Sequence, residues 1–166
     1  ALAAASKALD LADAGKPGPE VWFARQAHAR ALSLLGQSEA ALTEMRSAVD
    51  GLGKAYAPAS VPVLRARRSV AEMLARKGDF DAAWKEATLV ATALAGAAGG
   101  SPVELGLTFD LLGCIERGRG RLAEAAAWHA QAHEALRRQL ADDHPFLARN
   151  ALYRERTASL ATDSPQ

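Results

Sequence analysis

Three glycines of this chain, Gly36, Gly78 and Gly120, are separated by 42 residues each, and small residues recur at fixed distances from them. One lies seven residues before each glycine, and a small or apolar residue follows it at five and at twelve positions. These nine positions are Ala29, Ala71 and Gly113; Ala41, Ala83 and Ala125; and Ala48, Val90 and Ala132. Such an equal spacing predicts a stack of repeated supersecondary units, each packed mainly on its neighbours, rather than one closed core.

The composition indicates that these units are helical. Alanine makes up about a quarter of the 166 residues and aromatic residues only 5%, and runs of alternating β-branched residues are absent. We therefore expect an all-α solenoid of antiparallel helix hairpins with about eight helices. The expected elements are a partial-repeat helix over 1–14, hairpins over 19–53, 60–95 and 102–140, a terminal capping helix over 143–161, and a frayed tail over 162–166.

Capping residues mark several of the expected helix starts. Pro19 suits the first turn of a helix, and Asp79 is placed to cap the helix that follows Gly78. Ser101 and Glu104 have the spacing of a capping box, in which each side chain binds the other residue's backbone N–H. Asp142 or Asp143 is expected to cap the last helix.

The small-residue and glycine spacing resembles the tetratricopeptide repeat, a helix-turn-helix unit with small residues where its two helices cross. The 42-residue length and the segment Asp143-His144-Pro145 resemble the kinesin-light-chain-type subclass of that family. The chain departs from the family pattern at the tyrosine expected four residues before each turn glycine, where Leu32, Leu74 and Glu116 stand.

The resemblance implies a right-handed superhelix whose first helix in each repeat lines a concave, peptide-binding groove. The first repeat would contribute Phe23, Gln26, Ala27, Arg30, Ser33 and Leu34; the second Arg65, Arg68, Ser69, Glu72, Ala75 and Arg76; and the third Leu107, Asp110, Leu111, Cys114, Arg117 and Gly118. Five arginines and two acids give this set a charge of 5 − 2 = +3, against +1 for the chain. Since a guanidinium can bind a carboxylate through two hydrogen bonds, the groove favours an acidic partner. Alternatively, these arginines are ordinary solvated or internally paired side chains.

Other candidate sites favour structural roles. His129 and His133 lie four residues apart on one helix, but two ligands do not make a zinc site, and the acid follows the second histidine. Trp84 and Trp128 are expected to fill the space between neighbouring repeats, and Cys114 to be inert. No nucleophile, base and orienting group recur at an interpretable spacing, so we expect no enzymatic activity, cofactor or metal.

The sequence thus predicts a protein-interaction module that binds another protein or a segment of its own parent chain. Two alternatives remain open: a regulatory sensor domain of a larger kinase or transcription regulator that binds a small effector or signalling peptide, and a homo-oligomerisation scaffold, such as a homodimer. The near-neutral charge, the single cysteine and the lack of a long apolar run favour a cytoplasmic segment that binds neither nucleic acid nor membrane. Because the first residue is alanine, we expect a piece excised from a longer protein.

Overall fold

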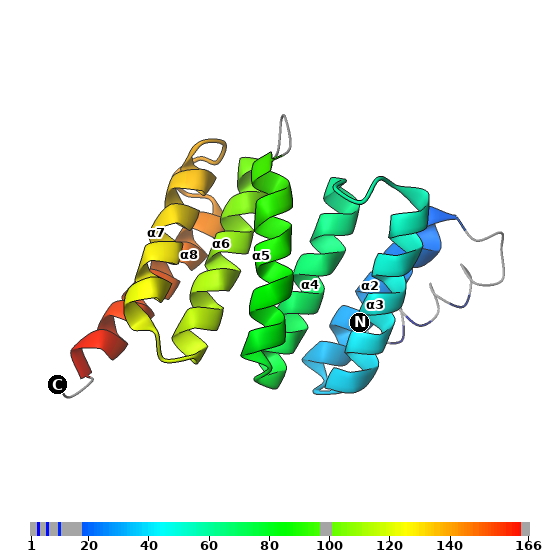
Figure 1. Cartoon of the computed structure of the whole chain (residues 1–166), viewed down its shortest axis with the longest axis horizontal. Helices are drawn as coiled ribbons and strands as arrows, with labels where there is room; N and C mark the ends of the chain where they lie inside the picture. The colour runs from blue at the N-terminus through cyan, green and yellow to red at the C-terminus, as the bar shows by residue number, and fades with distance from the viewer. Residues whose placement is uncertain (1–2, 4–5, 7–9, 11–17, 97–100, 164–166) are drawn as a thin grey trace. The chain divides into compact units, whose positions relative to one another are not determined.

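The computed structural model describes residues 3, 6, 10, 18–96 and 101–163, and in these residues it contains seven helices and no strand (Figure 1). The expected helix over 1–14 lies almost wholly outside the described residues. The helices are α2 (Pro19–Leu34), α3 (Ser38–Ala55), α4 (Val61–Lys77), α5 (Phe80–Gly96), α6 (Pro102–Gly118), α7 (Leu122–Arg137) and α8 (Pro145–Asp163). The expected all-helical architecture is confirmed. The bounds differ most at α7, which ends before the expected residue 140, and at α8, which includes Thr162 of the expected frayed tail.

The chain divides into two compact units, residues 1–77 and 78–166, which we describe separately. In the first unit α3 packs against both α2 and α4. In the second, α6 packs against α5 and α7, and α8 packs against α7 and more lightly against α6. The boundary falls at Gly78, the turn of the second expected hairpin.

The repeated glycines take the same backbone conformation, with φ of 77° at Gly36, 87° at Gly78 and 78° at Gly120. At Gly36 the backbone N–H groups of Gly36 and Gln37 donate to the carbonyls of Ser33 and Leu32. At Gly120 the N–H groups of Gly120 and Arg121 donate to the carbonyls of Arg117 and Glu116 in the same pattern. This is the Schellman motif, which requires a left-handed residue just beyond the helix and therefore favours glycine.

The other repeated positions also share one environment, because all nine are buried. Those occupied by alanine or valine expose at most 1% of their surface, and Gly113 is buried as well. Small side chains at these sites let neighbouring helices approach closely, so the 42-residue spacing marks a true structural register.

Two of the expected caps are confirmed and one is corrected. The Ser101 hydroxyl accepts the Glu104 N–H at 3.3 Å, and Asp79 Oδ1 accepts the Ala82 N–H at 3.2 Å. The prediction that Asp142 or Asp143 caps α8 is wrong, since His144 Nδ1 accepts the Phe146 N–H at 3.1 Å. Pro145 occupies the first helical position, so the side chain just before it is the one within reach of the next N–H.

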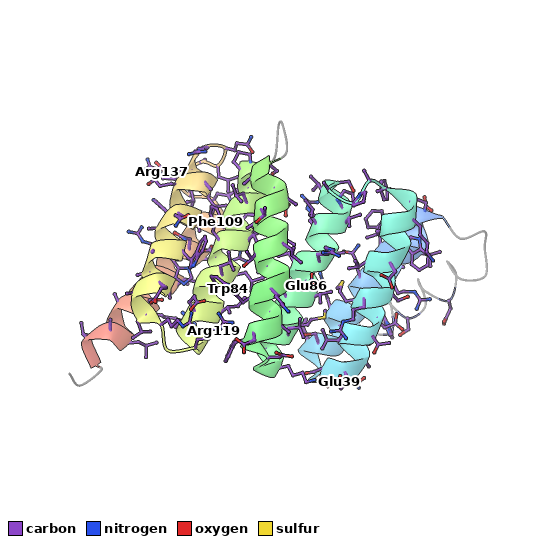
Figure 2. The ribbon with its side chains drawn as sticks, viewed as in Figure 1. Glu39, Trp84, Glu86, Phe109, Arg119 and Arg137 are labelled. Atoms are coloured by element: carbon purple, nitrogen blue, oxygen red, sulfur yellow. The ribbon has the colours of Figure 1, made fainter. Side chains whose placement is uncertain are left out.

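Three half-buried aromatic rings of the second unit meet between α5, α6 and α7. The Trp128 ring lies 5.9 Å from that of Trp84 and 5.4 Å from that of Phe109, centroid to centroid. Figure 2 labels Trp84 on α5 and Phe109 on α6. The prediction that these tryptophans fill the space between repeats is confirmed.

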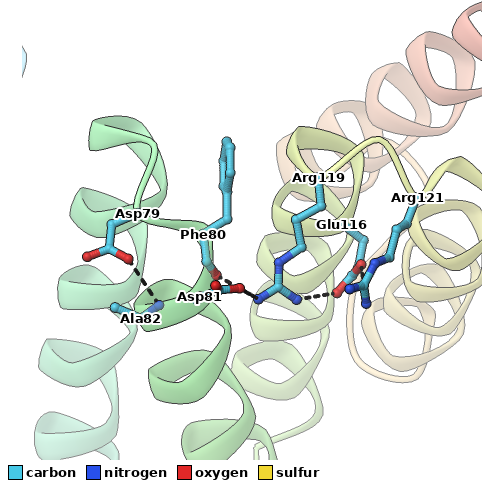
Figure 3. A network of polar contacts seen from close by, with 7 residues as sticks. All are labelled: Asp79, Phe80, Asp81, Ala82, Glu116, Arg119 and Arg121. Atoms are coloured by element: carbon cyan, nitrogen blue, oxygen red, sulfur yellow. Dashed lines mark hydrogen bonds and ion pairs between the residues drawn. The ribbon is translucent and has the colours of Figure 1, made fainter.

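A polar network joins the start of α5 to the end of α6 (Figure 3). Arg119 donates to the Phe80 carbonyl at 3.2 Å and binds the carboxylates of Asp81 at 2.5 Å and Glu116 at 2.9 Å. Arg121 forms a further ion pair with Glu116 at 3.5 Å. Glu116, which replaces the tyrosine of the family pattern, therefore has two arginines to offset the cost of burying its carboxylate.

A second, fully buried network joins α6, α7 and α8. Asp110 Oδ1 accepts the side-chain amide of Asn150 at 2.7 Å and lies 3.0 Å from His129 Nδ1, while the same amide reaches the His129 carbonyl at 2.9 Å. A Cβ atom at Gly113 would lie 2.6 Å from the His129 ring, so glycine at this repeated position makes room for the histidine. The network holds α8 against α6.

Ion pairs connect the helices of the first unit. Arg25 of α2 binds Glu44 of α3 at 3.0 Å, and Lys77 at the end of α4 pairs with Glu39 at the start of α3. The hydrogen bond from Lys77, reinforced by its positive charge, lowers the pKa of Glu39 below its ordinary value of 4.5.

The turn geometry predicts opposite effects of two glycine substitutions in the first unit. Gly36→Ala should lower the free energy of unfolding by about 1 kcal/mol, because a side chain at positive φ is strained. Gly53→Ala, within α3, should raise it by about 0.5–1 kcal/mol through better helix propensity. Neither new Cβ would meet an atom within 4 Å. Urea unfolding followed by circular dichroism measures the free energy of unfolding of both variants. Equal changes in the two variants would contradict a left-handed turn at Gly36.

Asn150→Ala should destabilise the chain by about 2 kcal/mol or more, because it removes a buried donor and leaves the Asp110 carboxyl without that partner. Gln139→Ala, at an exposed position, is the matched control and should change the free energy of unfolding by less than about 0.5 kcal/mol. Urea titrations of both variants measure the difference. If Asn150→Ala lowered the free energy of unfolding no more than Gln139→Ala does, the network would not be what holds α8.

Glu39 should titrate below its ordinary pKa in an NMR carboxyl titration, and Lys77→Gln should raise that pKa toward 4.5. Since the folded-state pKa is the lowered one, the stabilisation from this ion pair is present at neutral pH and is lost as the pH falls through that value. Lys54→Gln, which changes another exposed lysine of the first unit, should leave the Glu39 pKa unchanged. An equal shift in both variants would contradict a specific pair.

Candidate functional site

The groove positions expected on α2 form an exposed stripe. Phe23, Ala27, Arg30 and Leu34 are all exposed, at spacings of four, three and four residues that place them on one side of a helix. Phe23 exposes 44% and Leu34 77% of its surface, so both side chains are available for contact with a ligand. Gln26 differs from the expectation, because it is buried at 8% exposure.

The expected positions on α4 are more mixed. Arg65 and Arg76 are exposed, whereas Arg68 and Glu72 are half-buried and form an ion pair at 3.0 Å. Ser69 is buried. Arg68 is therefore partly neutralised within its own helix, as the alternative of internally paired arginines anticipates.

Two hydrogen bonds bring α2 and α4 together at this surface. Arg30 Nη2 donates to the hydroxyl of Ser69, and Arg76 Nη1 donates to the hydroxyl of Ser33, each at 3.2 Å. We call the surface formed by Phe23, Ala27, Arg30, Ser33, Leu34, Arg65, Ser69 and Arg76 the α2–α4 face. Both bonds orient a guanidinium without neutralising it, because a hydroxyl carries no charge.

The charges of the first unit can be sorted by their partners. Arg25, Arg68 and Lys77 each pair with a carboxylate. Among the described residues, neither Arg30 nor Arg76 has a carboxylate partner, and their hydrogen bonds go to serine hydroxyls. These two cations can therefore accept a negative ligand without first breaking an ion pair.

The expected groove positions on α6 lie in a different environment. Leu107 is buried against Leu136 and Leu147, and Asp110 is 2% exposed within the network with His129 and Asn150. Neither is available to a peptide, and the physical reason is that α8 covers this side of α6. Leu111, Cys114 and Arg117 are half-buried, and Gly118 is exposed.

Residues of α8 stand at the positions equivalent to those of α6. They were missed from the sequence because residues 143–161 were given only a capping role. Adding 42 to Asp110, Cys114 and Gly118 gives Leu152, Arg156 and Leu160. All three are exposed. The repeat spacing itself was the signal that could have identified them.

The other residues considered as candidate sites, His129 and Cys114, contact neighbouring side chains of the protein. His129 is completely buried and stacks near Tyr153, with ring centroids 5.4 Å apart. Cys114 Sγ lies 4.0 Å from Arg117 Nη2. Within residues 18–96 and 101–163, no group of three or more histidine, cysteine or acidic side chains is arranged to hold a metal ion. None of the helices described has the length and apolar character needed to cross a membrane.

Comparison with known proteins gives structural matches only. No family model and no curated protein matches the sequence. A kinesin-light-chain-like protein from Podosopora anserina with nearly identical TPR-like repeats matches at a TM-score of 0.70 and 15% identity, over 97% of this chain and 77% of that one. BtubC (BKLC) from P. vanneervenii matches at 0.76 and 15% identity, over 96% and 64%. A MamA RS-1 double mutant matches at 0.53 and 19% identity, over 95% and 84%.

These structures share the helical-repeat architecture that the glycine spacing predicts, and their low identity limits the likeness to the fold. In its fold the chain is thus similar to solved tetratricopeptide-like helical-repeat structures.

Proposed function

We propose that this chain is a non-enzymatic protein-interaction module whose α2–α4 face binds an acidic peptide segment, from another protein or from its own parent chain. The single observation that carries the proposal is that Arg30 and Arg76 are exposed and hydrogen-bonded to serine hydroxyls, with no carboxylate partner among the described residues. The helical-repeat fold supports an interaction role in general, because such stacks present extended surfaces.

The chemistry of the face suits a carboxylate-bearing peptide. Each guanidinium is held by one hydroxyl at one nitrogen and retains further N–H donors for a ligand. A hydrogen bond between ions is stronger than one between neutral groups, so a carboxylate gains more from these donors than the serine hydroxyls do. Holding the arginines in place beforehand also reduces the side-chain entropy lost on binding.

Exposed apolar side chains on the same face add contact area. Phe23 lies near Tyr56, with ring centroids 6.4 Å apart, and Leu34 is the most exposed of the large apolar residues described. Apolar anchors beside charged groups are typical of peptide-binding surfaces. The α2–α4 face therefore favours an acidic segment that also carries apolar residues.

The double variant Arg30→Gln/Arg76→Gln should weaken binding of a fluorescein-labelled peptide of aspartate, glutamate and leucine residues by about tenfold or more, because two charge-assisted hydrogen bonds are lost. Fluorescence anisotropy measures the affinity. Raising the salt concentration should lower the affinity of the parent protein for the acidic peptide. A peptide with asparagine and glutamine at the acidic positions should bind weakly to both.

Arg46→Gln, which changes an exposed arginine on α3, is the matched control and should retain the parent affinity. Circular dichroism verifies that each variant is folded. A folded Arg30/Arg76 double variant that binds the acidic peptide as tightly as the parent would overturn the assignment of this face. Binding that requires self-association, detected by sedimentation, would favour the oligomerisation alternative instead.

A further inference from the structure

The 42-residue register extends to α8 and predicts which of its side chains take the groove positions. The α6 positions 107, 110, 111, 114, 117 and 118 correspond to Arg149, Leu152, Tyr153, Arg156, Ser159 and Leu160. On α6 the first two of these positions are buried under α8, as described above. On α8 the corresponding Arg149 and Leu152 are exposed, so the open surface of the second unit is carried by α8.

A pocket is present at this surface. It has a volume of about 500 Å³ and is lined by Arg117 from α6 and by Leu152, Glu155, Arg156, Ser159 and Leu160 from α8. Four of its five α8 residues occupy the positions given by the repeat spacing. Register and cavity therefore identify the same site independently, and we call it the α6–α8 pocket.

The leucines give the pocket an apolar wall. Leu152 exposes 52% and Leu160 47% of its surface. Large apolar side chains left this exposed, and gathered in one pocket, are typical of an interaction site rather than of a solvated helix face.

Arg117 supplies an oriented cation. Its guanidinium carbon lies 5.8 Å from the centre of the Tyr153 ring, a cation–π contact, and its Nη2 lies 4.0 Å from Cys114 Sγ. Its Nη1 is buried and has no hydrogen-bond partner within the described part of the chain. A buried donor without a partner is costly, so an acceptor from a ligand would be favoured at this position.

Arg156 adds a second cation, and neither it nor Arg117 forms an ion pair with a carboxylate of residues 18–96 or 101–163. Glu155 contributes one negative charge, so the lining has a net charge of 2 − 1 = +1. A carboxylate is therefore attracted to the two arginines.

We infer that the α6–α8 pocket binds a peptide segment in which a large apolar side chain adjoins a single carboxylate: the apolar group packs on Leu152 and Leu160, and the carboxylate binds Arg117 and Arg156. This inference rests on the proposed peptide-binding function but uses a different set of residues. It assigns the second unit a preference for mixed apolar and acidic sequence, whereas the α2–α4 face is defined by its unneutralised arginines.

The test uses three fluorescein-labelled peptides of equal length in a glycine and serine background. The first carries one leucine next to one aspartate, the second replaces the leucine with serine, and the third replaces the aspartate with asparagine. In NMR titrations the first peptide should shift the methyl signals of Leu152 and Leu160 and the guanidinium signals of Arg117 and Arg156. The second and third should bind at least about fivefold more weakly at these signals, since each lacks one of the two contacts.

Two pocket variants and two matched controls complete the design. Leu152→Asp and Arg117→Gln should each reduce affinity for the leucine–aspartate peptide about fivefold or more. Leu89→Asp, at a leucine 54% exposed on α5, and Arg138→Gln, at an exposed arginine outside the pocket, should bind as the parent does. Folded Leu152→Asp and Arg117→Gln proteins with parent affinity, or equal affinity for all three peptides, would overturn the inference.

The experiments distinguish a failure of the α2–α4 proposal from a failure of the pocket inference. If the α2–α4 proposal is wrong, Arg30→Gln/Arg76→Gln leaves acidic-peptide binding unchanged while the Leu152 and Arg117 effects persist. If the pocket inference is wrong, the Leu152 and Leu160 signals do not respond to the leucine–aspartate peptide, whatever happens at Arg30 and Arg76.

Discussion

Close approach of helices at columns of small residues is the constraint on which the rest of this structure depends. Because alanine side chains are small, two helices that cross at alanines can approach closely. Each such contact buries little apolar surface, so each helix must be covered by a neighbour to bury enough. The turn glycines serve the same end, because a left-handed residue ends the first helix and returns the chain antiparallel. Larger rings, such as Trp128 between Trp84 and Phe109, fill the spaces that small residues leave.

Equivalent positions of a repeat do not share an equivalent exposure, and this difference determines where a ligand can bind. On α2 the stripe from Phe23 to Leu34 is open, whereas on α6 Leu107 and Asp110 are covered by α8. The buried hydrogen bonds of Asn150 explain why α8 stays in that position, since separating it would remove the Asn150 amide from both the Asp110 carboxyl and the His129 carbonyl. In the second unit, the exposed side chains at the groove positions are therefore those of the α6–α8 pocket.

Local signals in the sequence predicted the helices well. Glycine, proline and the Ser101 and Asp79 caps act over a few residues, so the helix starts at Pro19 and Pro102 could be assigned without tertiary information. The cap of α8 was assigned incorrectly, because aspartate is the commoner capping residue and the reach of the His144 ring depends on the path of the turn. The end of α7 was placed too late, since nothing in residues 138–140 breaks a helix by composition alone.

The sequence by itself determined the repeat register, the helical class and the presence of surplus arginines, because periodicity and turn chemistry are local and repeat along the chain. Only the tertiary structure decided which arginines keep an uncompensated charge. Arg68 finds Glu72 one helical turn away, whereas Arg30 and Arg76 reach across to serines on the neighbouring helix. The Arg68–Glu72 pair follows from a spacing of four residues within one helix. The contacts of Arg30 and Arg76 depend on distances between side chains of separate helices, which spacing along the sequence does not contain.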